Sequence, residues 1–284
     1  QMMEWSRAAV KLAKDYTLEH LEELADFGSF ESNHLSIVDE NGGLDLYDGN
    51  LRAIDAEGNK IIDQVDPQDY LSEIAEEVRD WSYMKFPFLK KVGPENGWYR
   101  VGPLARLNCC DSIDTPEAEA ARKEFADVTD GKPCNVTMGY HWARMIETLH
   151  SCEKIKELLN DPDLQGEDLV TTGDRRDETV AIIEAPRGTL FHHYKVNEND
   201  QVTMANLIVS TTNNNEPMNR AVQQVAGSHI SGKPEITEGL LNRVEVAIRA
   251  YDPCLSCATH ALGQMPLHVE LQDAAGQVID RKTK

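Results

Sequence analysis

Apolar residues recur at helical spacing between Met3 and Phe27, with acidic residues between them, which predicts a helix packed on the body of the protein. From Leu35 to Ile62 the period changes to two, and turns rich in Gly and Asn interrupt it. This pattern predicts short strands in a small, peripheral meander. Residues 66–81 return to a helical pattern, and the aromatic segment 83–99, punctuated by Pro and Gly, is typical of an ordered loop.

The second half of the chain alternates between helical and strand patterns. A helix should begin at Thr115-Pro116-Glu117, because a hydroxyl can cap free amides and proline fits the first helical position. A long helix is expected from Val136 to Leu159, which carry one broad apolar face. Further strands are expected at 180–183, 189–196 and 202–210, further helices at 218–226 and 238–250, and a terminal hairpin over 267–279. The sequence therefore predicts a helix-rich α+β body with small peripheral β-sheets and no interdomain linker.

Charge and cysteine usage exclude several classes of protein. Lys plus Arg number 28 against 49 for Asp plus Glu, and the resulting charge of −21 would repel nucleic acid and anionic lipid. No run of about 18 apolar residues is present, so no membrane span is expected. Six cysteines without regular spacing do not resemble a disulfide framework and indicate a reducing compartment, the cytoplasm.

The main candidate for chemistry is the string Asp252-Pro253-Cys254-Leu255-Ser256-Cys257-Ala258-Thr259-His260. Two thiols three residues apart, followed by a histidine, place three metal ligands within a short stretch of chain. Cys-x2-Cys alone is shared by zinc sites, redox centres and iron-sulfur proteins. A structural zinc site normally needs a second pair, and the other four cysteines (Cys109, Cys110, Cys134 and Cys152) form no Cys-x2-Cys; for the adjacent Cys109 and Cys110 we expect only buried thiols.

With its flanking residues the string resembles the C-terminal metal motif of nickel-iron hydrogenase large subunits, Asp-Pro-Cys-x-x-Cys-x-x-His. The upstream segments Glu184-Ala185-Pro186-Arg187-Gly188 and Ser210-Thr211-Thr212-Asn213 match the same family in order and approximate spacing. Residues 102–108 resemble a segment of its soluble members, although a loop crossing the core would explain them equally well. The resemblance covers essentially the whole chain and fits the soluble, bidirectional, NAD-linked type best.

The resemblance implies the metal ligands. Cys254 would be a terminal nickel ligand, Cys257 would bridge nickel to an iron that carries cyanide and carbonyl ligands, and His260 would ligate magnesium. Heterolytic cleavage of dihydrogen needs an electron-poor metal and a base, and a thiolate can serve both as a ligand and as the proton acceptor.

The resemblance also implies a pocket around those metals. Arg187 would lie above the open metal position, paired with Asp252, because a guanidinium keeps its charge and presents several directed donors. Thr211 would hydrogen-bond a cyanide on the iron, and the backbone around Pro186 would line the pocket. Without the resemblance, Pro-Arg-Gly would be an exposed turn with a solvated arginine, and Thr211 would serve ordinary turn chemistry.

The family carries a second Cys-x-x-Cys pair near its N-terminus, which is absent here. Residues 1–260 are therefore expected to form a single domain, the C-terminal part of a large subunit without its N-terminal metal-binding part. Residues 261–284 would be an extension that a maturation endopeptidase removes after His260.

The function implied is reversible oxidation of dihydrogen, with electrons passed first to an iron-sulfur small subunit, then through a diaphorase module to NAD. Two alternatives stay open: the corresponding subunit of a methyl-viologen-reducing, heterodisulfide-linked hydrogenase, and a non-catalytic protein with a structural Cys/His zinc site. The quinone-site subunit of respiratory complex I is disfavoured, because that lineage has lost the metal-binding cysteines.

Overall fold

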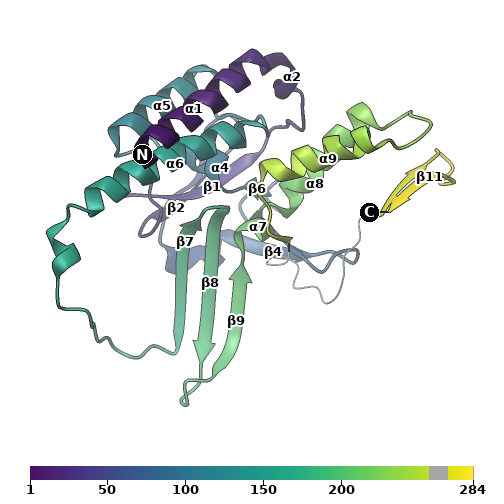
Figure 1. Cartoon of the computed structure of the whole chain (residues 1–284). Coiled ribbons are helices and arrows are strands. Elements are labelled where there is room, and N and C mark those ends of the chain that lie inside the picture. The colour runs from purple at the N-terminus through teal and green to yellow at the C-terminus, as the bar shows by residue number, and fades with distance from the viewer. Residues whose placement is uncertain (256–267, 284) are drawn as a thin grey trace.

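The computed structural model describes residues 1–255 and 268–283, in which helices stack on one side of small sheets (Figure 1). The helices are α1 (Met2–Glu19), α2 (Leu21–Ala25), α3 (Tyr70–Glu73), α4 (Pro103–Cys109), α5 (Pro116–Asp127), α6 (Gly139–Leu158), α7 (Ser210–Asn213), α8 (Asn215–His229) and α9 (Glu238–Ala250). The strands are β1 (Asn33–Val38), β2 (Asn50–Ile54), β3 (Lys60–Val65), β4 (Ile74–Val78), β5 (Lys85–Leu89), β6 (Tyr99–Arg100), β7 (Glu178–Ala185), β8 (Gly188–Val196), β9 (Val202–Ile208), β10 (His268–Gln272) and β11 (Val278–Thr283).

The strands form four small sheets. The largest has the order β3-β2-β1-β6, in which β6 is parallel to β1 and the other pairs are antiparallel. An antiparallel sheet β7-β8-β9 projects from the body, and β4 with β5 forms a hairpin. The hairpin β10-β11 lies apart from the helices at the far edge of the molecule (Figure 1). The α+β class with small sheets is confirmed.

Two apolar clusters make the core. The first surrounds α6, where Trp142 is 1% exposed and meets the ring of Phe125 edge-on at 5.1 Å. The second lies between β1, β2 and the sheet β7-β8-β9, and includes Leu35, Leu51 and Phe191. Helix α4 contacts α6, which belongs to the first cluster, and β1, which belongs to the second.

Several sequence predictions are confirmed. The strands of the 35–62 region, the helix that begins at Pro116, the long helix within 136–159, the three strands of 180–210, the two later helices and the terminal hairpin all form. Thr115 precedes α5 without capping it, because its hydroxyl lies 2.9 Å from Nδ1 of the buried His150. No helix among residues 1–255 and 268–283 is long and apolar enough to span a membrane.

Other predictions are wrong, and tertiary contacts explain why. Residues 66–81 do not form one helix: a 3-10 turn over Pro67–Asp69 and the short α3 lead into β4, which pairs with β5 in the register Ile74↔Leu89. The meander is not peripheral, because Leu35, Ile37 and Leu51 are fully buried. The N-terminal helix is broken at His20, and Trp5 on α1 is 63% exposed.

Candidate functional site

The turn between β7 and β8 carries Arg187. The last paired residues of the hairpin are Ala185 and Gly188, which leaves Pro186 and Arg187 as the turn. Gly188 has φ +133°, and a Cβ there would come within 2.3 Å of the side chain of Val101 and 2.7 Å of the amide nitrogen of Gly102. Only glycine lets the two backbones approach this closely. The turn is therefore seated directly on the N-terminus of α4.

Arg187 reaches across to the segment that follows α9. Its Nε donates to the backbone carbonyl oxygen of Asp252 at 2.5 Å, and its Nη2 lies 3.4 Å from the carboxylate of the same residue. The two side chains are 41% and 45% exposed. Asp252 has φ +51°, a conformation that most residues avoid. The structure thus brings Arg187 and Asp252 together on a turn where both side chains remain partly exposed.

Thr211 joins the same place from α7. Its side chain is 2% exposed, and its hydroxyl oxygen accepts a hydrogen bond from the backbone N–H of Cys254 at 3.1 Å. On the same helix, Ser210 donates to the carbonyl of Gly188 at 2.7 Å and Asn213 donates to the carbonyl of Thr189 at 2.9 Å. Helix α7 therefore holds both the start of β8 and the backbone of Cys254.

Sequence reasoning missed Arg106, a buried cation on α4. Its Nε and Nη2 donate to Glu147 on α6 at 2.5 and 2.6 Å, and its Nη1 donates to Glu184 at 2.7 Å. The same guanidinium also donates to the carbonyl oxygens of Ala185 at 2.9 Å and Pro186 at 3.2 Å. Residues 102–108 are thus no loop but a helix in the core. A charged residue inside an apolar segment was the signal in the sequence.

Burial shifts the pKa of two charged groups near these residues, Glu184 and Arg144. It raises the pKa of the Glu184 carboxyl group, although Arg106 and the hydroxyl of Thr189 oppose the shift. It lowers the pKa of Arg144 on α6, where the nearby Asp252 opposes the shift. Arg144 donates from Nη2 to the carbonyl of Ala250 at 2.9 Å, while its buried Nε has no hydrogen-bond partner in the described part of the chain.

These observations fit a thiolate-bound metal centre beside Cys254. Two guanidinium groups, Arg187 and Arg144, contact the chain within four residues of Cys254, and cations would stabilise the negative charge of a thiolate at this position. Cys257 and His260 lie outside the described residues, so the structure does not place them. Within 1–255 and 268–283 no group of three or more His, Cys, Asp or Glu residues is arranged to hold a metal ion.

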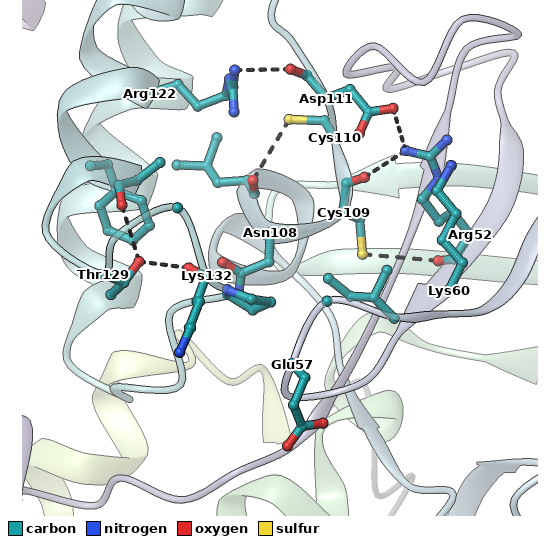
Figure 2. A pocket seen from close by; sticks show the side chains of 17 residues that line it. Arg52, Glu57, Lys60, Asn108, Cys109, Cys110, Asp111, Arg122, Thr129 and Lys132 are labelled. Carbon is teal, nitrogen blue, oxygen red and sulfur yellow. Dashed lines mark hydrogen bonds and ion pairs between the residues drawn. The ribbon is translucent and has the colours of Figure 1, made fainter.

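A cavity of about 380 Å³ lies elsewhere, at the opposite end of α4 (Figure 2). Arg52, Cys109, Cys110 and Arg122 are among its lining residues. Both cysteines are buried, as expected, and their sulfurs lie 4.0 Å from the carbonyl of Arg52 and 3.8 Å from that of Leu107. Burial raises the pKa of both thiols, that of Cys110 to about 12, which is unfavourable for a metal ligand.

A sequence profile of the family described as nickel-dependent hydrogenase matches residues 22–260. The chain belongs to this hydrogenase family. It is 46% identical, over its full length, to the NAD-reducing hydrogenase HoxS subunit beta of Cupriavidus necator, covering 59% of that protein. It is 42% identical to the iron-sulfur subunit of the F420-non-reducing hydrogenase of Archaeoglobus profundus, over 98% of this chain and 60% of that protein.

Solved hydrogenase structures agree with this assignment. The crystal structure of an NAD+-reducing [NiFe]-hydrogenase in the H2-reduced state matches 91% of this chain and 57% of its own chain, with a TM-score of 0.87 and 52% identity. A [NiFeSe] hydrogenase variant from Desulfovibrio vulgaris Hildenborough matches with a TM-score of 0.60 at 21% identity, which supports the fold alone. The chain therefore spans less than two thirds of the length of these relatives.

Proposed function

We propose that this chain forms part of the catalytic large subunit of a nickel-iron hydrogenase that reversibly oxidises dihydrogen. The observation that carries the proposal is the convergence of Arg187, Thr211 and the Asp252–Cys254 segment, which come from three distant parts of the chain. A structural zinc site does not explain this convergence, because it needs neither an arginine turn nor a hydroxyl on the cysteine backbone.

Nickel and iron, the latter with cyanide and carbonyl ligands, would supply the electron-poor centre at which dihydrogen is polarised. Cys254 and Cys257 would hold these metals as thiolates, and a thiolate such as that of Cys254 could also accept a proton at Sγ. Arg187, whose Nε donates to the carbonyl of Asp252, would lie above the open metal position, and the backbone around Pro186 would line the pocket. Thr211, whose hydroxyl oxygen accepts from the amide of Cys254, would also hydrogen-bond a cyanide on the iron.

The family resemblance implies further ligands and an electron path. Two further thiolates would complete the metal site. His260 would ligate magnesium nearby. Electrons would pass to the iron-sulfur small subunit of the complex. A cytoplasmic location, expected from cysteine usage, stays a prediction.

We assign residues 1–260 to the mature subunit; residues 261–284 would be an extension removed by a maturation endopeptidase. The assignment is supported by the position of hairpin β10-β11 at the edge of the molecule (Figure 1), where Asp280 accepts a hydrogen bond from the amide of Ile236 at 2.8 Å. Mass spectrometry of the active enzyme should find a large subunit that ends at His260. An active enzyme that keeps Lys284 would refute the assignment.

The electron acceptor is NAD in this proposal, through a diaphorase module, because the relative from Cupriavidus necator is named as NAD-reducing. A second candidate, a heterodisulfide-linked or viologen-reducing enzyme, is supported by the 42% identity to the F420-non-reducing relative. Hydrogen-dependent reduction of NAD by the purified complex would separate the two: a complex that reduces viologen dyes but not NAD belongs to the second class.

The function itself is tested by metal analysis and infrared spectroscopy of the purified complex. Stoichiometric nickel, with iron in excess because the iron-sulfur subunit also holds iron, together with bands from iron-bound carbonyl and cyanide, is the expected result. Stoichiometric zinc without such bands would end the hydrogenase proposal and favour a structural zinc site.

A further inference from the structure

Arg106 is buried, and each nitrogen of its guanidinium donates at least one hydrogen bond. Its side chain is 2% exposed, and Glu147 receives two of its hydrogen bonds from Nε and Nη2. This paired contact fixes the plane of the guanidinium, because a planar fork matches a carboxylate in one orientation. The remaining donors, on Nη1 and Nη2, then point in set directions.

Those donors reach three consecutive residues. Nη1 donates to the carboxylate of Glu184 at 2.7 Å and to the carbonyl of Ala185 at 2.9 Å, and Nη2 donates to the carbonyl of Pro186 at 3.2 Å. The next residue in the chain is Arg187. A single side chain on α4 therefore contacts all three residues that precede Arg187.

The two ends of the turn are held independently. The carboxylate of Glu184 also accepts from the hydroxyl of Thr189 at 2.6 Å and from the amide of Ile37 at 3.2 Å, so it ties the hairpin to β1. On the far side, Gly188 is pressed against Val101 and Gly102, the residues that lead into α4. Once these contacts exist, the backbone of Arg187 has little freedom.

We propose that Arg106 is a positioning residue for Arg187, and this rests on the proposed hydrogenase function. One cation with two buried carboxylates contributes little net stability compared with apolar side chains of similar volume, because desolvation offsets the attraction. The cluster instead fixes the position of the turn relative to α4. It thereby determines where the guanidinium of Arg187 contacts Asp252.

The test is Arg106→Lys in the purified hydrogenase, with Arg52→Lys as a matched control. Arg52 is also buried, at 3% exposure, and it contacts two carboxylates, Asp63 at 2.7 Å and Asp111 at 2.9 Å. It also donates to a backbone carbonyl, that of Cys109 at 2.9 Å, at the other end of α4 (Figure 2). Both variants lose a buried planar fork, but only the first touches the turn.

We expect both variants to keep nickel and iron. Arg106→Lys should lower the rate of hydrogen oxidation on the order of 100-fold, since a misplacement of about 1 Å has that effect on a preorganised site. It should also shift the infrared bands of the iron-bound carbonyl and cyanide, which report the surroundings of the metals independently of turnover. Arg52→Lys should leave the rate and the bands at parental values.

If Arg106→Lys matches Arg52→Lys in both readouts, the proposal is overturned, while the hydrogenase function stands. If the parental enzyme itself holds zinc and shows no bands, the proposed function fails first. Should Arg106→Lys not fold, the triple variant Arg106→Met, Glu147→Leu, Glu184→Gln removes the buried charges together. Its turn would still be unsupported, so parental turnover in that variant would equally refute the positioning role.

Discussion

Arg187 contacts Asp252 mainly through the backbone: its Nε lies 2.5 Å from the carbonyl oxygen, whereas its Nη2 lies 3.4 Å from the carboxylate. The arginine is therefore anchored by the position of the Asp252 peptide more than by the charge of the side chain. Its Nη1 makes no hydrogen bond to the described residues. The two residues consequently differ in what their substitution should do.

Replacing Arg187 by lysine should lower hydrogen turnover while nickel and iron stay bound. Lysine keeps the charge but replaces a planar fork by a single point donor, and loss of one directed donor at such a site typically costs on the order of 100-fold in rate. Hydrogen oxidation and metal content would be measured together. The control is Arg249→Lys, an arginine on α9 that pairs with Glu245 at 2.6 Å on the surface. Parental turnover in Arg187→Lys would show that this arginine is a surface residue.

Asp252→Asn should have a much smaller effect than Arg187→Lys. The backbone carbonyl that accepts from Nε is unchanged by the substitution, and only the longer, half-exposed ion pair is lost. Such pairs are worth roughly 0–1 kcal/mol, so turnover should fall by less than about tenfold. A loss as large as that of Arg187→Lys would mean that the carboxylate acts directly in the reaction.

Thr211→Val should remove the hydrogen bond that fixes the backbone of Cys254, and Thr211→Ser should keep it. Valine has nearly the same shape but no acceptor, so the partly buried amide of Cys254 would lose its 3.1 Å hydrogen bond; a fully buried, unsatisfied amide costs about 1–3 kcal/mol, which is the upper limit here. The expected result is a lower nickel content and a lower unfolding temperature for the valine variant alone. Equal nickel content in the two variants would contradict this role of the hydroxyl.

The sequence predicted most of the helices and strands because long periodic segments report their burial directly. The 66–81 region failed because its helical pattern competes with a tertiary contact: β4 gains a strand partner in β5, and this outweighs local preference. The prediction that the strands of residues 35–62 are peripheral was wrong for a different reason. Alternation of apolar and polar residues indicates one buried face, and the packing of the sheet β7-β8-β9 against β1 buries the other face as well.

The sequence motifs indicated the residues of the candidate site but not the contacts that support them. Short motifs named Arg187, Thr211, Asp252 and Cys254, while the hydrogen bonds that join them cross up to 65 residues of chain. Periodicity carries no information on such distant contacts. Arg106 illustrates the limit, because its acceptors include two backbone carbonyls, which no residue type in the sequence can reveal.

Cys109 and Cys110 should resist alkylation in the native protein. Burial raises the pKa of both thiols, that of Cys110 to about 12, so at pH 8 almost no thiolate is present to react. Mass spectrometry after treatment with iodoacetamide should find both residues unmodified in the folded protein and modified after denaturation. Rapid native labelling of either residue would show that the cavity beside α4 opens to solvent.

His34 should make the folded protein less stable as the pH falls below about 6.5. The ring lies on β1, fully buried, and burial, aided by the charge of Arg100, lowers its pKa to about 3. The unfolded chain therefore binds a proton that the folded one does not, and stability rises with pH between these two values. The part of the stability that depends on a neutral His34 is fully present above the pKa of the unfolded chain. It is lost progressively as the pH falls toward 3.

The measurement is the unfolding temperature of the protein from pH 7 to pH 4, compared with that of His34→Asn. Carboxyl groups titrate in both proteins, so the difference between the two curves isolates the histidine. We expect the parental protein to lose more stability than the variant over this range. His20→Asn, which alters a histidine whose side chain is 38% exposed at the end of α1, should follow the parental curve. If His34→Asn also follows it, the buried ring accepts its proton without opposing the fold, and burial is not what controls its titration.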